Sequence, residues 1–254
     1  MLIDTHSHIY STDFIHDRDE IIQRAYSNDV RKIILPNIDS SSVKNLLDMV
    51  DSYPHICIPL MGLHPTSVNH DYQEELQLVE YWLKKRKFYG IGEIGIDLYW
   101  ETSFLEEQTQ AFRFQLNLAH EYQLPVVIHV RDSFDEVYNV LLEEKGKNLT
   151  GVFHSFTGTL EQAQLVIDLG FKIGVNGIIT FKKSGLDEVI SKIDTSHIIL
   201  ETDSPYLTPV PFRGKRNESS YLVHIAQKIA ELHHMTVGEI AKITTENARK
   251  LFGI

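Results

Sequence analysis

Short apolar runs alternate with longer, amphipathic segments along the chain. The amphipathic segments include Leu105–Tyr122 and Leu160–Gly170, and the second ends on a glycine, as helices often do. The final stretch, Thr236–Gly253, predicts a helix that closes the chain. The apolar runs have the length and composition of buried strands, and they cover Leu2–His6, Arg31–Pro36, Ile56–Gly62, Tyr89–Ile94, Pro125–Val130, Gly151–His154, Lys172–Val175 and His197–Glu201.

This alternation predicts an α/β fold, a single (β/α)8 TIM barrel over residues 1–254. A doubly wound open sheet is the competing arrangement, but it usually has fewer strands and a glycine-rich phosphate loop. Neither a G-x-G-x-x-G nor a Walker motif follows the first apolar run. The pattern therefore favours the barrel.

Ionisable residues stand where several of the predicted strands end. Strand residues alternate between faces, so His6 and His8 in "IDTHSH" are expected to point the same way. Other runs end in "GEIG", "VIHVRD", "VFHSF" and "LETDSP". Active sites of these barrels lie at the carboxyl ends of the strands. One rim is therefore expected to carry His6, His8, Glu93, His129, His154 and Asp203.

Each of these residues has an ordinary explanation when it is taken alone. Glu93 would serve as a helix cap, and His129 as a hydrogen-bonded core histidine. Six buried acids and histidines without partners would carry a large free-energy cost, and a bound metal ion would satisfy all of them at once. Neutral imidazoles and carboxylates are ligands for zinc, manganese and, less often, iron or nickel. The expected cofactors are divalent ions, Zn, Mn or Mg.

Six donors exceed the need of one tetrahedral ion, so we expect two ions roughly 3.5–4 Å apart. The expected partition gives one ion His6, His8 and Asp203 and the other ion His129 and His154, with Glu93 and a hydroxide bridging them. Such a site keeps residual positive charge, which favours an anionic substrate such as a phosphodiester.

Composition narrows the classes of partner. The chain has 35 acidic and 24 basic residues and a formal net charge of -11, which argues against coating duplex nucleic acid through a broad basic surface. An enzyme that engages the end of a nucleic-acid strand at one local site stays possible.

The single cysteine, Cys57, lies in an apolar run and is expected to be a buried, inert thiol. With no secretory or membrane-spanning pattern, we expect a cytoplasmic protein without membrane contact, and no feature indicates an obligate protein partner.

The motifs "IDTHSH", "GLHP", "GEIGID", "IHVRD", "GVFHSFTG", "ETDSPYL" and "RGKRN" resemble, in this order, those of the TatD family of metal-dependent hydrolases. The resemblance covers the whole chain. It implies a (β/α)8 barrel, a divalent-metal site and DNase activity, often as a 3′-to-5′ exonuclease, and it assigns the six residues above as metal ligands. Two departures concern the rim and hence substrate preference: Ser219 where the family often has proline, and "DLYW" at Asp97–Trp100.

The expected chemistry uses the bridging hydroxide as nucleophile, with Glu93 and Asp203 as catalytic residues. Asp203 would hold one ion and orient or deprotonate the water, and a purely ligating role is the alternative. Asp4 is expected either to fix a histidine tautomer or to be an exposed or helix-capping residue.

Two further residues are placed to contact a substrate phosphate, His64 in "GLHP" and Arg131 beyond His129. A salt bridge to Asp132 or Asp135 is the alternative for Arg131. The "RGKRN" stretch either adds positive charge to the same rim or forms a solvated loop. The aromatic residues Tyr99, Trp100 and Phe104 either stack on unpaired bases or pack on the adjacent helix.

The leading functional hypothesis is a metal-dependent DNase that trims single-stranded or frayed ends. An amide, ester or lactone hydrolase is the alternative, but such enzymes often bridge their metals with a carboxylated lysine at the end of the fourth strand, where this chain has Glu93. A metal-bound scaffold without turnover is a further alternative, and the complete ligand set argues against it.

Overall fold

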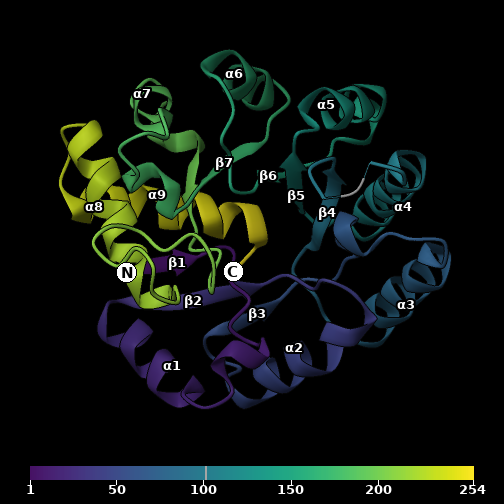
Figure 1. The fold of residues 1–254 in the computed structure, drawn as a ribbon, viewed down its shortest axis with the longest axis horizontal. Helices are drawn as coiled ribbons and strands as arrows, with labels where there is room; N and C mark the ends of the chain where they lie inside the picture. Colours follow the sequence, from purple (N-terminus) through teal and green to yellow (C-terminus); the bar gives the residue numbers. More distant parts are fainter. Residues whose placement is uncertain (101) are drawn as a thin grey trace.

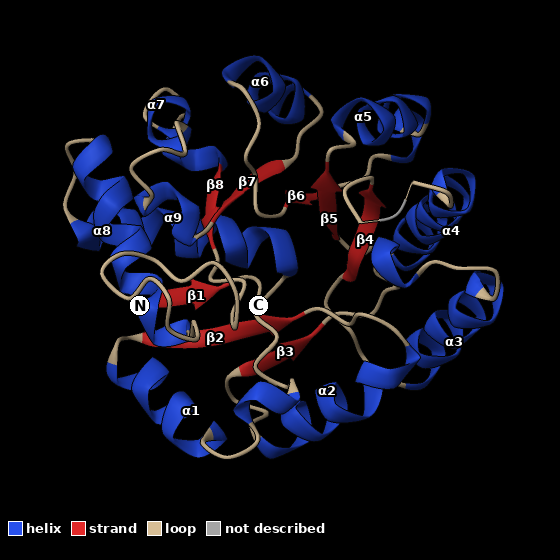
Figure 2. Cartoon of the chain, in the orientation of Figure 1, coloured by secondary structure: helices blue, strands red, loops and turns tan. Residues whose placement is uncertain are grey.

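The computed structural model describes residues 1–100 and 102–254, and in them short parallel strands alternate with helices (Figures 1 and 2). The strands are β1 (Leu2–Asp4), β2 (Val30–Leu35), β3 (Cys57–Pro59), β4 (Ile91–Asp97), β5 (Val126–Arg131), β6 (Gly151–Phe153), β7 (Lys172–Val175) and β8 (Ile198–Leu200). The α-helices are α1 (Arg18–Ser27), α2 (Ser40–Ser52), α3 (Tyr72–Lys85), α4 (Leu105–Tyr122), α5 (Phe134–Glu143), α6 (Leu160–Asp168), α7 (Leu186–Ile190), α8 (Leu222–Leu232) and α9 (Val237–Phe252).

The strands form one closed ring. Hydrogen bonding orders them β1-β2-β3 and β4-β5-β6-β7-β8, and neighbouring strands pair in parallel. A bridge between Met61 and Ile91 joins β3 to β4, and a bridge between Ser7 and Ser204 joins the segments after β1 and β8. The predicted single-domain (β/α)8 barrel is therefore confirmed.

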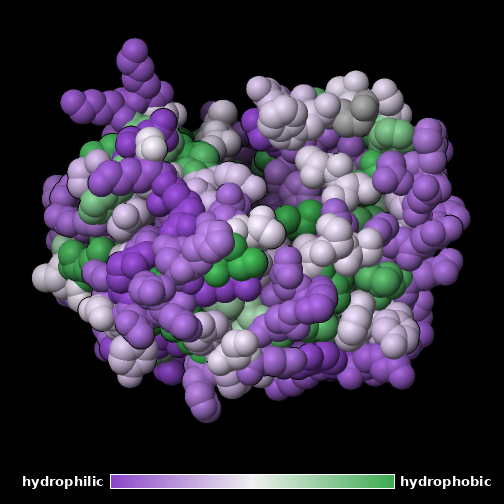
Figure 3. All heavy atoms as spheres, turned by 60° about the horizontal axis from the view of Figure 1, so that its bottom comes forward, coloured by the Kyte–Doolittle hydropathy of each residue, from purple (hydrophilic) through white to green (hydrophobic). Residues whose placement is uncertain are grey.

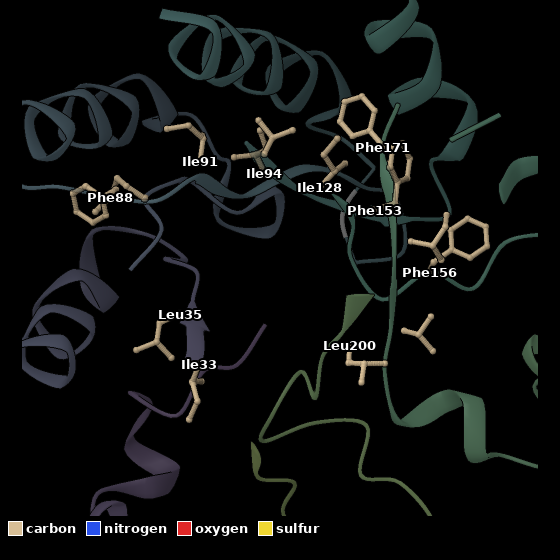
Figure 4. Close-up of a cluster of buried hydrophobic side chains, with 14 of the residues drawn as sticks. Ile33, Leu35, Phe88, Ile91, Ile94, Ile128, Phe153, Phe156, Phe171 and Leu200 are labelled. Atoms are coloured by element: carbon tan, nitrogen blue, oxygen red, sulfur yellow. The ribbon is translucent and has the colours of Figure 1, made fainter. Parts of the chain in front are cut away.

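Alternation along the strands divides the core into two layers. Ile33 and Leu35 of β2 face outward and pack with side chains of the surrounding helices, in the cluster drawn in Figure 4. Ile34 faces inward. The inner core, which fills the barrel, consists of Ile3, Ile34, Ile58, Leu60, Val127, Val152, Ile199, Ala248 and Phe252.

The last helix contributes to the inner core. Ala248 and Phe252 of α9 pack against the inward side chains of the strands, and α9 contacts both β1 and β8. The helix begins with a capping box in which Thr236 and Glu239 exchange hydrogen bonds, and it ends at Gly253, whose φ of 65° suits a left-handed cap. The predicted C-terminal helix therefore also seals one end of the barrel.

Seven of the eight predicted strands differ in their bounds from the observed ones, and the third is reduced to Cys57–Pro59. The differences in the first and fourth strands bear on the site. The first ends at Asp4 instead of His6, because Thr5 donates its backbone N–H to Leu200 and Ser7 donates to Ile34, so the chain alternates between its two neighbours. The fourth runs on to Asp97, because its last residues stay paired with β5. Both differences fall at the carboxyl ends of strands.

The face in Figure 3 is mostly hydrophilic, with apolar atoms visible in small separate groups. Among the described residues, no helix is both long enough and apolar enough to span a bilayer.

Candidate metal centre

The structure brings the six predicted donors together at the carboxyl ends of the strands. His6 and His8 follow β1, Glu93 and His129 lie within β4 and β5, His154 follows β6, and Asp203 follows β8. Glycine makes the approach of two of these strands possible. Gly95 has a φ of 142°, and a Cβ there would lie 2.0 Å from the backbone oxygen of His129. The "GEIG" motif thus holds Glu93 and His129 side by side.

Glu93 lies between two groups of histidines. Its Oε2 is 3.1 Å from His6 Nε2 and 3.8 Å from His8 Nε2. Its Oε1 is 2.8 Å from His129 Nδ1 and 3.6 Å from His154 Nε2. Oε2 therefore faces His6 and His8, and Oε1 faces His129 and His154, so the carboxylate is placed to contact two ions. His64 also approaches Oε1, at 3.4 Å.

Asp203 faces the same donors from the opposite side of the ring. Its Oδ1 lies 3.8 Å from His6 Nε2 and 3.7 Å from His8 Nε2, and its Oδ2 lies 3.9 Å from His154 Nε2. Its backbone N–H donates to the carbonyl of His6 at 2.9 Å. The predicted grouping of His6, His8 and Asp203 is one set whose donor atoms all lie within 4.8 Å of one another.

Hydrogen bonds outside the cluster select which nitrogen of His8 faces it. Tyr10 donates its hydroxyl proton to the carbonyl of Pro36 at 2.6 Å, so its oxygen is left to accept from His8 Nδ1 at 2.9 Å. His8 Nε2 then carries a lone pair and lies 3.1 Å from His6 Nε2. Two imidazole nitrogens this close fit a shared cation.

Buried carboxylates orient the other two histidines. His129 donates Nε2–H to Asp97 at 2.9 Å, and its Nδ1 donates to Glu93 Oε1 at 2.8 Å. Burial opposes protonation of His129, but these two hydrogen bonds outweigh it and raise its pKa. His154 Nδ1 lies 3.0 Å from Glu201 Oε1, although outside hydrogen-bond angles, and its Nε2 faces the cluster. Carboxylate partners of this kind fix the tautomer and raise the basicity of a histidine that binds metal.

The pKa values of His6, His8 and Glu93 suit the binding of a cation. Burial, with the charge of His154 nearby, lowers the pKa of His6 well below 6.5, and burial lowers the pKa of His8 to about 4. Burial opposes ionisation of Glu93, but the surrounding histidines outweigh it and hold its pKa well below the ordinary value. At neutral pH His6 and His8 are thus neutral and Glu93 is ionised, the forms that bind metal.

On the opposite side, two groups retain protons. Burial opposes protonation of His154, but the negative charges of Glu201 and Glu93 outweigh it and raise its pKa to about 10. Burial raises the pKa of Asp203 to about 7. A divalent cation bound here must displace these protons, so its binding releases them.

Three residues of the site were not predicted from the sequence: Tyr10, Asp97 and Glu201. A signal existed for Asp97, which follows Glu93 by four positions and therefore shares its face of β4. Glu201 precedes Asp203 by two positions. Both expectations for Asp4 were wrong, because its buried carboxylate accepts from the backbone and hydroxyl of Thr202 and from no imidazole.

His64 lies beside Glu93, but its tautomer is the reverse of that of His8. The backbone N–H of Thr66 donates to His64 Nδ1 at 3.1 Å, so the proton of the neutral imidazole sits on Nε2. Nε2 lies 3.4 Å from Glu93 Oε1. His64, Glu93 and His129 are close enough to hold an ion, but this tautomer makes His64 a donor instead of a ligand.

Above the donors lies a cleft of about 640 Å³, and its lining includes His64, Trp100, Arg131 and Tyr206. The guanidinium of Arg131 covers the ring of Tyr99 at 3.9 Å instead of pairing with Asp132 or Asp135.

The contacts also bear on the predictions for the basic stretch "RGKRN" and for the three aromatic residues after the fourth strand. In "RGKRN", Arg216 pairs with Asp17 and Arg213 covers the ring of Phe181, so these two cations are already engaged. Phe104 contacts the ring of His70, whereas Tyr99 and Trp100 stay exposed.

A closed barrel with histidines and carboxylates gathered at its carboxyl rim defines a metal-dependent hydrolase. The sequence profile of the family described as TatD related DNase matches residues 3–253, and the chain belongs to this family. It is 38% identical to the uncharacterized metal-dependent hydrolase YabD of Bacillus subtilis, with 100% of both chains covered. It is 31% identical to the 3′-5′ ssDNA/RNA exonuclease TatD of Erwinia tasmaniensis, again over 100% of both chains. The solved structure of the TatD homologue YjjV from Escherichia coli K12 superimposes with a TM-score of 0.93 at 32% identity, covering 100% of this chain and 98% of that one.

Proposed function

We propose that the protein is a two-metal phosphodiesterase that trims single-stranded or frayed DNA ends, as a 3′-to-5′ exonuclease. The observation that carries this proposal is the position of Glu93, whose Oε2 lies 3.1 Å from His6 Nε2 and whose Oε1 lies 2.8 Å from His129 Nδ1. A carboxylate in that position suits a pair of cations better than a single one.

In this assignment one ion is held by His6, His8 and Asp203, the other by His129 and His154, and Glu93 is shared. The tautomer of His8 supports the assignment, because its Nε2 presents a lone pair to the cluster. His129 would do the same with Nδ1 once an ion displaces the proton that this nitrogen donates to Glu93. Zn, Mn or Mg bound there would supply a water molecule that is acidic enough to act as nucleophile near neutral pH, and would stabilise charge on a phosphate.

Asp203 is the residue to which we assign orientation of the attacking water and acceptance of its proton. Its carboxylate borders the cleft and is more exposed than that of Glu93. A substrate phosphate in the cleft would therefore meet Asp203 from the open side.

His64 and Arg131 are the proposed phosphate contacts. His64 lines the cleft and carries its proton on Nε2, beside Glu93, where a phosphate at the ions could accept it. The Arg131 guanidinium adds forked donors at the rim. These groups concentrate positive charge and donors at one place, which lets a protein of net charge -11 bind a polyanion locally.

The relative from Erwinia tasmaniensis, whose name describes an exonuclease on single-stranded DNA and RNA, supports the substrate class. The decisive experiment strips the protein of metal, restores single ions and assays end-labelled single- and double-stranded DNA, RNA, a phosphomonoester and a lactone. We expect metal-dependent release of mononucleotides from 3′ ends. Glu93→Gln, purified in parallel, excludes contaminating nucleases, because it should be inactive. Hydrolysis of the lactone with none of DNA would overturn the proposal.

A further inference from the structure

Two exposed aromatic side chains from different strand ends line the mouth of the cleft. Trp100 follows β4 and is 67% exposed, and Tyr206 follows β8 and is 59% exposed. Both line the cleft. In a closed ring of eight strands β4 and β8 are four positions apart, so these side chains come from opposite sides of the mouth.

Trp100 is oriented by its neighbours although it is exposed. The Asp97 carboxylate accepts the backbone N–H groups of Tyr99 and Trp100 at 3.0 Å each. The Trp100 ring stands at 89° to that of Tyr99, with the centroids 5.0 Å apart. The Arg131 guanidinium lies 3.9 Å above Tyr99 and 5.3 Å from Trp100. This arrangement limits the freedom that a ligand would have to remove.

Tyr206 is fixed relative to the proposed proton acceptor. Its backbone N–H donates to the carbonyl of Asp203 at 2.8 Å, and its own carbonyl accepts from the Asn217 side chain at 2.6 Å. The Tyr206 side chain lines the cleft. The donor cluster thus has a positioned aromatic ring on either side.

We propose that Trp100 and Tyr206 stack on the two nucleobases that flank the scissile phosphate of a single-stranded substrate. This rests on the proposed phosphodiesterase function and names how that site selects its substrate. Stacking accepts every base, because each has a π-face. Bases inside a duplex are already stacked on their neighbours, so only unpaired ends can occupy both rings. Arg131, beside Trp100, would meet the phosphate between the bases.

The test compares three short oligothymidylates: one intact, one with an abasic last residue and one with an abasic penultimate residue. On the intact strand, Trp100→Ala and Tyr206→Ala should each lower kcat/KM by about 5- to 150-fold, the range for loss of one base–aromatic stack. Each variant should lose this effect on one of the two abasic strands, and the two variants on different strands. Trp100→Phe should keep most of the activity. Tyr81→Ala, an equally exposed aromatic on α3, serves as the control and should change nothing.

Fluorescence provides a readout independent of turnover. The chain has two tryptophans, and Trp82 lies on α3, so Trp82→Phe leaves Trp100 as the only emitter. A nuclease-resistant phosphorothioate oligothymidylate should quench this emission, and an abasic strand with the same phosphates should not.

The outcomes separate the two proposals. If the wild type neither cleaves nor binds any strand, the phosphodiesterase function fails and the stacking proposal falls with it. If the wild type cleaves the intact strand but Trp100→Ala loses activity equally on all three strands, the residue acts through its loop and only the stacking proposal is overturned. Equal quenching of Trp100 emission by intact and abasic strands would also overturn the stacking proposal.

Discussion

Asp97 accepts the Nε2–H of His129 with one carboxylate oxygen, at 2.9 Å, and holds the turn that carries Trp100 with the other. One buried side chain thus connects a proposed metal ligand to the proposed base-stacking ring. Removal of the Asp97 carboxylate should therefore affect both metal binding at His129 and the position of Trp100.

Asp97→Ala should therefore weaken the ion held by His129 and His154 by about 10- to 100-fold, the usual effect of losing a carboxylate behind a ligating histidine. The ion held by His6 and His8 should be retained. Competition with graded chelators measures the two affinities. Asp135→Ala, which removes an exposed carboxylate nearby on α5, should leave both unchanged. Equal weakening of both ions would contradict the assignment of Asp97 to one of them.

Glu93→Ala should impair both ions, because each loses the carboxylate oxygen that faces its histidines. Elemental analysis of wild type and variant, after dialysis against the same buffer, gives the metal content per chain. His64→Ala is the matched control, since His64 contacts Glu93 but presents a proton instead of a lone pair. Two tightly held ions in Glu93→Ala would defeat the bridging assignment.

Asp203→Asn should keep the fold, because the side chains are nearly isosteric, and should reduce turnover by about 10²-fold or more. The assay must be run at saturating metal, since loss of a ligand also weakens ion binding. Full activity at high metal concentration would leave Asp203 as a ligand alone.

Arg131→Ala should lower kcat/KM on DNA by roughly 10- to 150-fold, the range for a charge-assisted contact to phosphate. Metal content should stay at the wild-type level, because Arg131 is exposed and contacts Tyr99 instead of the donors. Arg131→Lys should restore only part of the loss, since lysine supplies charge without the fork. Unchanged DNA cleavage alongside damaged lactone hydrolysis would argue for the amide- and lactone-hydrolase class.

Phe252→Ala should destabilise the fold by about 3–5 kcal/mol, the usual cost of truncating a buried phenylalanine. Phe252 is 4% exposed and belongs to the inner core at the end of α9. Urea unfolding of the metal-free protein measures the change, with Tyr81→Ala as a surface control. A loss below about 1 kcal/mol would mean that α9 does not support the barrel.

The strands and the donor residues could be predicted because both depend on local patterns. Apolar runs of strand length mark the barrel, and the ionisable residues at the ends of five of these runs mark its rim. The seventh strand was predicted with its observed bounds, Lys172–Val175. The sequence does not give the end of β1, because there the backbone of Thr5 and Ser7 alternates between partners that are distant in the chain.

Hydrogen-bond partners around the donors could not be predicted in the same way. His8 presents the lone pair of Nε2 because its Nδ1–H donates to the Tyr10 hydroxyl. The Tyr10 oxygen accepts this bond because its own proton is donated to the carbonyl of Pro36. His64 and His8 are both histidines near a strand end, yet one presents a proton and the other a lone pair. Only the packed structure distinguishes them.

The bridge between Ser7 and Ser204 closes the ring of strands next to the proposed first ion. That ion would take His6 and His8 from the segment after β1 and Asp203 from the segment after β8, so its ligands come together where the ring closes. A polypeptide that stops before Asp203 would hold the two histidines without this carboxylate. Binding of the proposed first ion therefore depends on closure of the barrel.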